Sequence, residues 1–255
     1  MENTKQEIEL AINLYKSQNF FKAESLTKKL ITNNPKMPFL YNLMGLILSS
    51  QGKNDDAIKF YKEGISIQPS YAMIYNNLGT IYKYKKNYIE AESYYKKSIE
   101  LNNNIAETHN NLGNLYIESE KTNRAITVLT NTLNRSTSPA TQSEGLRNLR
   151  QAYELKKNYI KAIHIASKQF KQSPEKKHEE LMDYIQGLIL QKMDQRNLEN
   201  LLNTFPNTFP GDLALIRLIE LRTAQGDEVL AELDSHRASH LFGAIEKGVQ
   251  CILTT

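Results

Sequence analysis

The chain has 255 residues, with 32 lysines and arginines, 28 aspartates and glutamates, and one cysteine. This length allows one large or two small domains, and 40% hydrophobic residues with 24% charged ones is typical of a globular protein. The single cysteine, Cys251, excludes an intramolecular disulfide framework and a thiolate zinc site. A net charge of +4 is too small to indicate nucleic-acid binding.

No apolar run approaches the roughly 18 residues that cross a membrane. The first ten residues, MENTKQEIEL, show no basic stretch followed by an apolar one, so we expect no secretory signal and a cytoplasmic protein. Eleven glycines and seven prolines together make only 18 of 255 residues. So few helix breakers in so long a chain predict helix throughout.

Small residues and prolines recur every 34 positions in the first two thirds of the chain. The recurring alanines are Ala23, Ala57, Ala91 and Ala125, and the recurring glycines are Gly45, Gly79 and Gly113. Pro35 and Pro69 keep the same interval, and apolar residues between them follow helical spacing. Several classes of position that share one period indicate a tandem repeat of helix pairs, in which small residues allow two helices to approach closely.

This pattern resembles the tetratricopeptide repeat family. Aligned on the alanines, the units are 4–37, 38–71, 72–105 and 106–139, and a fifth follows at 143–176 after a three-residue slip. The first unit has Ala11 at the glycine position and the fifth has Arg150. The resemblance implies an all-α superhelix of antiparallel helix pairs, in which each pair covers the exposed apolar side of its neighbour.

The repeat pattern weakens after residue 176. We expect a degenerate sixth helix pair and a loop in 177–210, with the loop at 203–211, and capping helices in 211–255. Asp212 is the expected cap of a helix at 213–224, and a last helix is expected from about Asp227 into the 240s.

No catalytic motif was found. The chain has no phosphate-binding loop, no dinucleotide-binding glycine motif and no nucleophile elbow, and Cys251 has no nearby histidine in the sequence. His236 and His240 would share one helix face, but Arg237 stands where a zinc protease has its glutamate. We therefore expect no enzyme, no cofactor and no metal site.

Asparagine recurs in register on the first helix of the units, whereas a composition bias alone would scatter it. The fifth position holds Asn42, Asn76 and Asn110, the sixth Asn77, Asn111 and Asn148, and the ninth Asn114. The array resembles the asparagine ladder of O-linked N-acetylglucosamine transferases, which implies that these amides, with Phe39 and Tyr84, face a concave peptide-binding groove. A carboxamide both donates and accepts, so it can pair with a peptide backbone.

The leading hypothesis is a protein-interaction scaffold that binds an extended peptide or partner protein, with no nucleic acid and no membrane as partner. An alternative is the substrate-recruiting arm of a glycosyl-, sulfo- or methyltransferase whose catalytic part lies elsewhere. A third is an oligomeric scaffold, a homodimer formed through the C-terminal helices. The array lacks the lysine and arginine pair with which another branch of the family clamps acidic peptide ends.

Overall fold

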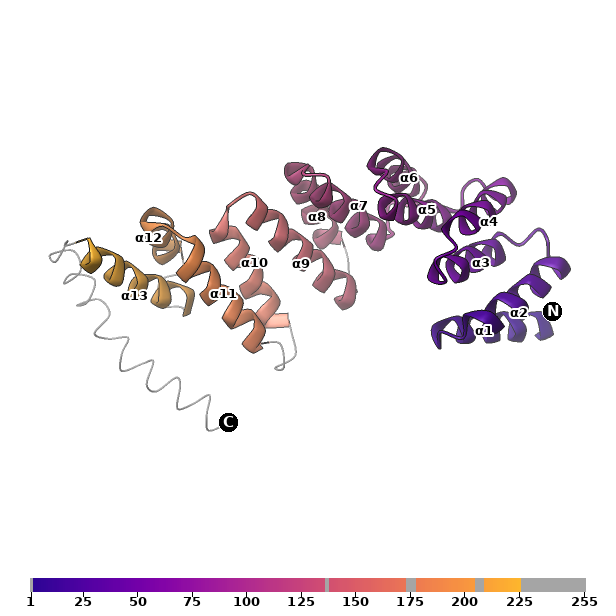
Figure 1. Ribbon diagram of the computed structural model, residues 1–255, viewed down its shortest axis with the longest axis horizontal. Helices are drawn as coiled ribbons and strands as arrows, with labels where there is room; N and C mark the ends of the chain where they lie inside the picture. Colours follow the sequence, from indigo (N-terminus) through magenta and orange to yellow (C-terminus); the bar gives the residue numbers. More distant parts are fainter. Residues whose placement is uncertain (1, 136–137, 173–177, 205–208, 226–255) are drawn as a thin grey trace, which may run out of the picture. The chain divides into compact units, whose positions relative to one another are not determined.

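A computed structural model describes residues 2–135, 138–172, 178–204 and 209–225, and all the elements that it describes are α-helices (Figure 1). In chain order these are α1 (Glu2–Lys16), α2 (Phe20–Asn33), α3 (Pro38–Ser50), α4 (Asn54–Ile67), α5 (Ala72–Tyr84), α6 (Tyr88–Leu101), α7 (Ala106–Glu118), α8 (Thr122–Arg135), α9 (Pro139–Leu155), α10 (Tyr159–Gln172), α11 (His178–Lys192), α12 (Gln195–Thr204) and α13 (Phe209–Ala224). The fold is a solenoid of consecutive helix pairs, as the sequence predicts.

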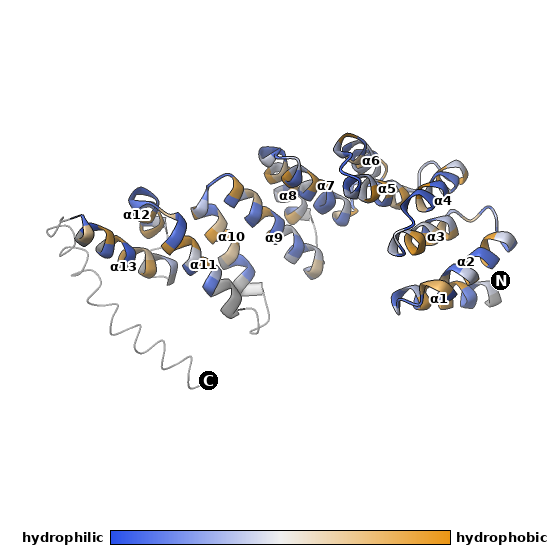
Figure 2. Ribbon diagram, in the orientation of Figure 1, coloured by the Kyte–Doolittle hydropathy of each residue, from blue (hydrophilic) through white to orange (hydrophobic). Residues whose placement is uncertain are grey.

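The chain divides into two compact units, Met1–Asn148 and Leu149–Thr255, and the division falls inside α9. From α1 to α8, each first helix packs against its own second helix, and α2, α4 and α6 each pack against the next first helix. Orange and blue residues alternate along these helices in Figure 2, as expected of helices that bury one face. Among the described residues, no helix is both long and apolar enough to cross a bilayer.

The recurring glycines mark the closest contact within a helix pair. A Cβ added at Gly45 would lie 2.3 Å from the Tyr61 ring, and one at Gly79 would lie 2.7 Å from the Tyr95 ring. At Gly113 the opposing side chain is Leu129, at 2.5 Å. The first helix therefore supplies a residue without a side chain where the second helix supplies a large one.

In the first five helix pairs, the turn between the two helices has one residue in the left-handed conformation. These residues are Gln18, Gly52, Lys86, Glu120 and Lys157, with φ between 56° and 78°. The first four are 34 positions apart, and the last follows after 37. At Lys86 the backbone continues with a hydrogen bond from Asn87 N to Tyr82 O, which closes the helix end.

Buried apolar side chains form separate clusters along the chain. In the first unit, one cluster lies across α1, α2 and α3, around Ala11, Ala23 and Leu30, and another across α3, α4 and α5, around Tyr61 and Leu78. The second unit has its own cluster across α10 to α13. Each cluster joins at least two helix pairs, as stacking of repeats requires.

The end of the described chain differs from the prediction. Helix α13 begins at Phe209, so Pro210 and Gly211 lie in its first turn and not in a loop, and Asp212 is inside the helix. A proline in the first turn is compatible with helix because its missing N–H has no intrahelical partner there. The expected last helix, the proposed dimer contact of the C-terminal helices, His236, His240 and Cys251 lie outside the described residues.

Candidate protein-binding face

Three asparagines lie inside the contact between successive first helices. Asn42 on α3, Asn76 on α5 and Asn110 on α7 are exposed by 5%, 0% and 1%. They stand in helices whose other inward residues are mostly apolar. Burying a carboxamide costs free energy unless it forms hydrogen bonds, so each of these side chains needs a partner inside the protein.

The partner of two of them is the asparagine at the sixth position of the following first helix. Asn77 Nδ2 donates to Asn42 Oδ1 at 2.8 Å, which joins α5 to α3. One repeat later, Asn111 Nδ2 donates to Asn76 Oδ1 at 3.0 Å, which joins α7 to α5. The asparagine array is therefore a hydrogen-bonded ladder between neighbouring repeats, and its fifth-position members are inside the protein and not open to a ligand.

The third step of the ladder has a different form. Asn110 Nδ2 donates to the backbone oxygen of Thr141 in α9 at 3.0 Å. Its Oδ1 lies 3.0 Å from where a Cβ on Gly145 would stand and has no hydrogen-bond partner among the described residues. Asn148, which the sequence places in register with Asn77 and Asn111, is 8% exposed, and its Nδ2 is also unpaired. The regular amide-to-amide bonds thus join α3, α5 and α7.

Glu107 determines how the amide groups of Asn76 and Asn77 are oriented. Asn76 Nδ2 lies 3.4 Å from Glu107 Oε1 and 3.4 Å from Asn77 Oδ1. An ionised carboxylate only accepts hydrogen bonds, so Asn76 must direct its amino group at Glu107 and its oxygen at Asn111. The same logic directs the oxygen of Asn77 at Asn76 and its amino group at Asn42.

Half-buried and exposed side chains flank these bonds on α5 and α7. Residues spaced by three or four positions share one helix face. We call this surface the ladder face, and it consists of Met73, Asn77, Thr80 and Tyr84 on α5 and Glu107, Asn111, Asn114 and Glu118 on α7. Asn114 forms no hydrogen bond with the described residues, and Tyr84 is 72% exposed. Phe39, on α3, is half-buried.

One compensated ion pair joins the ladder face to a neighbouring residue. Lys83 Nζ lies 3.2 Å from Glu118 Oε1, and the two side chains are 10% and 39% exposed. The Lys83 ammonium also lies 5.5 Å from the centre of the Tyr84 ring. Thr80 Oγ1 is 3.1 Å from the Tyr95 hydroxyl, and burial raises the pKa of Tyr95 well above its usual range. These contacts fix the side chains that border the ladder.

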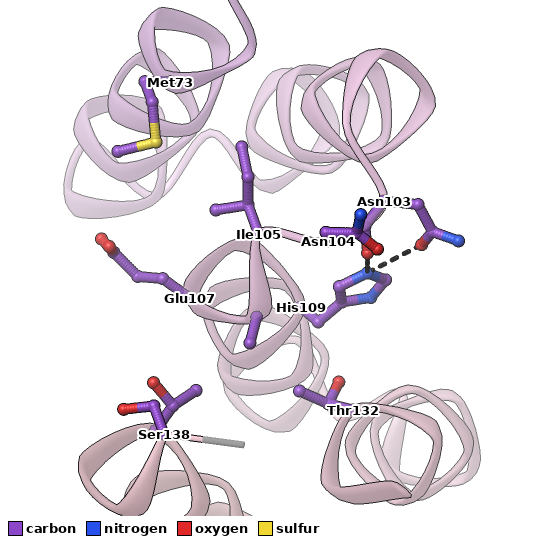
Figure 3. A pocket seen from close by; sticks show the side chains of 10 residues that line it. Met73, Asn103, Asn104, Ile105, Glu107, His109, Thr132 and Ser138 are labelled. Carbon is purple, nitrogen blue, oxygen red and sulfur yellow. Dashed lines mark hydrogen bonds between the residues drawn. The ribbon is translucent and has the colours of Figure 1, made fainter. Parts of the chain in front are cut away.

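A cavity of about 480 Å³ opens beside the start of α7 (Figure 3). Its lining comes from α5, the turn before α7, α7, α8 and the start of α9, and consists of Met73, Asn103, Asn104, Ile105, Ala106, Glu107, His109, Thr132, Ser138 and Thr141. Figure 3 shows the Glu107 side chain on the opposite side of α7 from His109. Glu107 thus lines the cavity and is also one of the residues of the ladder face.

His109 occupies the place of a tyrosine in the two preceding repeats. Tyr41 and Tyr75 each donate a hydroxyl hydrogen bond to the backbone oxygen six residues earlier, at 3.0 Å. His109 Nε2 lies 3.2 Å from the Asn103 backbone oxygen and 3.0 Å from Asn103 Oδ1. The imidazole thus holds the turn before α7 as the tyrosines hold theirs.

The described residues contain no group of three or more histidines, cysteines, aspartates or glutamates that could hold a metal ion. The carboxylate with the most perturbed pKa is Glu92, on α6. Partial burial alone would raise the pKa of Glu92, but hydrogen bonds from Lys121, Lys96 and Tyr116 outweigh it and lower the pKa to about 2. This group is an ion-pair centre between α6, α7 and α8.

Comparison with known families gives a match to the model described as tetratricopeptide repeat, at residues 36–104 and 70–138. No curated protein matches the sequence.

Many solved structures share the fold. BtubC (BKLC) from P. vanneervenii is 24% identical, with a TM-score of 0.60, over 66% of this chain and 78% of that one. PilF of Pseudomonas aeruginosa is 15% identical, with a TM-score of 0.61, over 91% and 98%. A chain of the APC/C hetero-tetramer Cut9–Hcn1 is 19% identical, with a TM-score of 0.63, over 83% of this chain but only 42% of that one. At these identities the likeness concerns the fold alone.

Proposed function

The chain belongs to the tetratricopeptide repeat family, whose model covers residues 36–138, and on that premise we propose that it is a non-catalytic scaffold that binds an extended segment of a partner protein on the ladder face. The observation that carries the proposal is the pair of asparagine bonds one repeat apart, Asn77 to Asn42 and Asn111 to Asn76. They hold three first helices in a fixed relation before any ligand arrives.

The ladder supports binding through preorganisation. Neighbouring packed helices lie about 10 Å apart, and an extended chain advances about 3.3 Å per residue. A bound segment would therefore meet one first helix about every third residue. Because the amides of Asn77 and Asn111 are already oriented by internal bonds, a ligand would not have to order them on binding.

In the proposal, the predicted groove residues have two different roles, according to whether they are buried or half-buried. Asn42, Asn76, Asn110 and Asn148 are buried and act as positioning residues in the proposal. Asn77, Asn111 and Asn114 are half-buried, and they contact the segment together with Phe39 and Tyr84. The solved APC/C hetero-tetramer Cut9–Hcn1 is a precedent for a protein of this fold that assembles with another protein.

The test is affinity capture from the source organism with wild type and with Tyr84→Ala/Asn114→Ala. Both residues lie on the ladder face, and neither change removes a bond of the ladder. The matched control is Ile89→Ala/Asn33→Ala, which removes an 81% exposed apolar residue and an exposed asparagine from second helices. We expect a partner captured by wild type and the control to be lost from the face variant. Equal capture by all three proteins would overturn the proposal.

A further inference from the structure

We infer that the segment bound on the ladder face is basic, with a lysine or arginine side chain that enters the cavity beside α7 and pairs with Glu107. This inference rests on the proposed function and specifies the partner's chemistry. Three features of the surface carry it: the direction of the amides, the balance of charge and the lining of the cavity.

Two amide oxygens of the ladder lack a close hydrogen-bond partner among the described residues. Asn111 Nδ2 gives one of its two N–H groups to Asn76, and its Oδ1 accepts no hydrogen bond from the described residues. Asn77 Nδ2 is likewise used in the bond to Asn42, and its Oδ1 receives only the long 3.4 Å contact from Asn76. A group that satisfies these oxygens must donate a hydrogen bond, as the ammonium of lysine and the guanidinium of arginine do.

The uncompensated charge of the face is negative. Lys83 is 10% exposed and already paired with Glu118, so it offers little to an anionic ligand. Glu107 is exposed, and its one hydrogen bond with the described residues is the 3.4 Å approach of the Asn76 amide. A cation that reaches Glu107 would form the first ion pair of that carboxylate within the described part of the chain.

The cavity suits a long cationic side chain. Glu107 is its only carboxylate, and Met73 and Ile105 supply apolar surface beside it. Lysine and arginine cover such surface with their methylene stems while the charged head reaches a polar group. The N-terminal ends of α7 and α9 also reach this cavity and favour anions. The partial positive charge of a helix N-terminus acts only within the first turn, and in α7 that turn contains Glu107. The full negative charge of the Glu107 carboxylate therefore outweighs it.

The experiment uses a displayed library of random peptides, selected on the full chain. Three proteins are compared: wild type, Glu107→Gln and Glu63→Gln. The control change removes the same charge from an exposed site on α4. Circular dichroism establishes that the variants are folded. We expect wild type and Glu63→Gln to enrich peptides with Lys or Arg at one fixed position, and Glu107→Gln to lose that preference.

A selected peptide should then bind Glu107→Gln about fivefold more weakly than wild type in titration calorimetry, and Glu63→Gln with unchanged affinity. Enriched peptides that lack the basic residue, that carry Asp or Glu in its place, or that are the same for Glu107→Gln would overturn this inference and leave the proposed function standing. If no peptide is enriched on any protein, the proposed function fails and the inference fails with it.

Discussion

Asn111 on α7 donates through Nδ2 to Oδ1 of Asn76 on α5 at 3.0 Å, and the accepting side chain is fully buried. This bond lies between two repeats and not within one, so it contributes to stacking of the solenoid. It also orients the Asn111 amide so that its Oδ1 has no partner among the described residues. Stability and recognition therefore depend on the same pair of residues.

Loss of this bond should destabilise the chain measurably. We expect Asn76→Ala to lower the free energy of unfolding by about 1–3 kcal/mol, because it removes the acceptor of Asn111 and leaves a void in a buried contact. Asn114→Ala, which removes the same side chain from the same face without a bond, should change it by less than about 0.5 kcal/mol. Urea denaturation followed by circular dichroism measures both, and equal midpoints would show that the ladder is not a stabilising element.

Glu92 should make stability sensitive to acid. Its side chain, 13% exposed, accepts hydrogen bonds from Lys96 at 2.7 Å, Lys121 at 2.8 Å and Tyr116 at 3.0 Å. These bonds lower its pKa from 4.5 to about 2 despite the opposing effect of burial. Because the pKa of Glu92 is lower in the folded protein than in the unfolded chain, the ionised carboxylate stabilises the fold at pH values above about 4.5. That contribution is lost as the pH falls from about 4.5 towards 2.

We therefore expect Glu92→Gln to lower the free energy of unfolding by about 1–2 kcal/mol at pH 7. The difference from wild type should shrink steadily below pH 4.5. Urea titrations at several pH values measure it, with Glu63→Gln as the exposed control. A difference that stays constant down to pH 2.5 would contradict the role assigned to the Glu92 ion pairs.

Two glycines in helices should respond in opposite directions to alanine. At Gly79 a new Cβ would stand 2.7 Å from the Tyr95 ring, so Gly79→Ala should cost about 1–3 kcal/mol through overpacking. At Gly187, in α11, nothing lies within 4 Å of the added Cβ. Gly187→Ala should stabilise by about 0.5–1 kcal/mol, because alanine is the better helix former. Thermal unfolding distinguishes the two, and destabilisation by both would refute the open space described at Gly187.

The left-handed turn residues offer sites for stabilisation. Lys86 has a φ of 57°, a conformation that costs a residue with a Cβ about 1 kcal/mol and glycine almost nothing. Lys86→Gly should therefore raise the melting temperature by a few degrees. Lys85→Gly, one residue earlier at a φ of −73°, should lower or leave it unchanged. A rise for both variants, or for neither, would show that turn geometry is not the cause.

The helix pairs could be predicted from the sequence because their determinants are local. Gly45, Gly79 and Gly113 mark the close contacts, and the structure places Tyr61, Tyr95 and Leu129 against them. The sequence shows that Arg150 stands where the earlier repeats have glycine, but it does not show why an arginine is accommodated there. In the structure its guanidinium lies 4.1 Å from the centre of the Tyr184 ring and donates to Gln169, and both partners come from helices other than its own.

The candidate site could be predicted only in part. Its asparagines were identifiable from their register, but burial depends on how neighbouring repeats meet. Asn76 and Asn77 are adjacent in the sequence and yet one is fully buried and the other half-buried. The orientation of the amides depends on Glu107, which is one repeat away along the chain from Asn76. The orientation of the amides therefore cannot be predicted from the sequence of one repeat alone.

The most direct test of the central claim is photo-cross-linking from defined positions to the captured partner. A benzophenone amino acid is placed at Asn114, on the ladder face, and in a second protein at Glu63, on α4. We predict cross-links to one continuous segment of the partner from position 114 and none from position 63. Cross-links from position 63 alone, or equal cross-links from both, would show that the partner binds elsewhere on the chain.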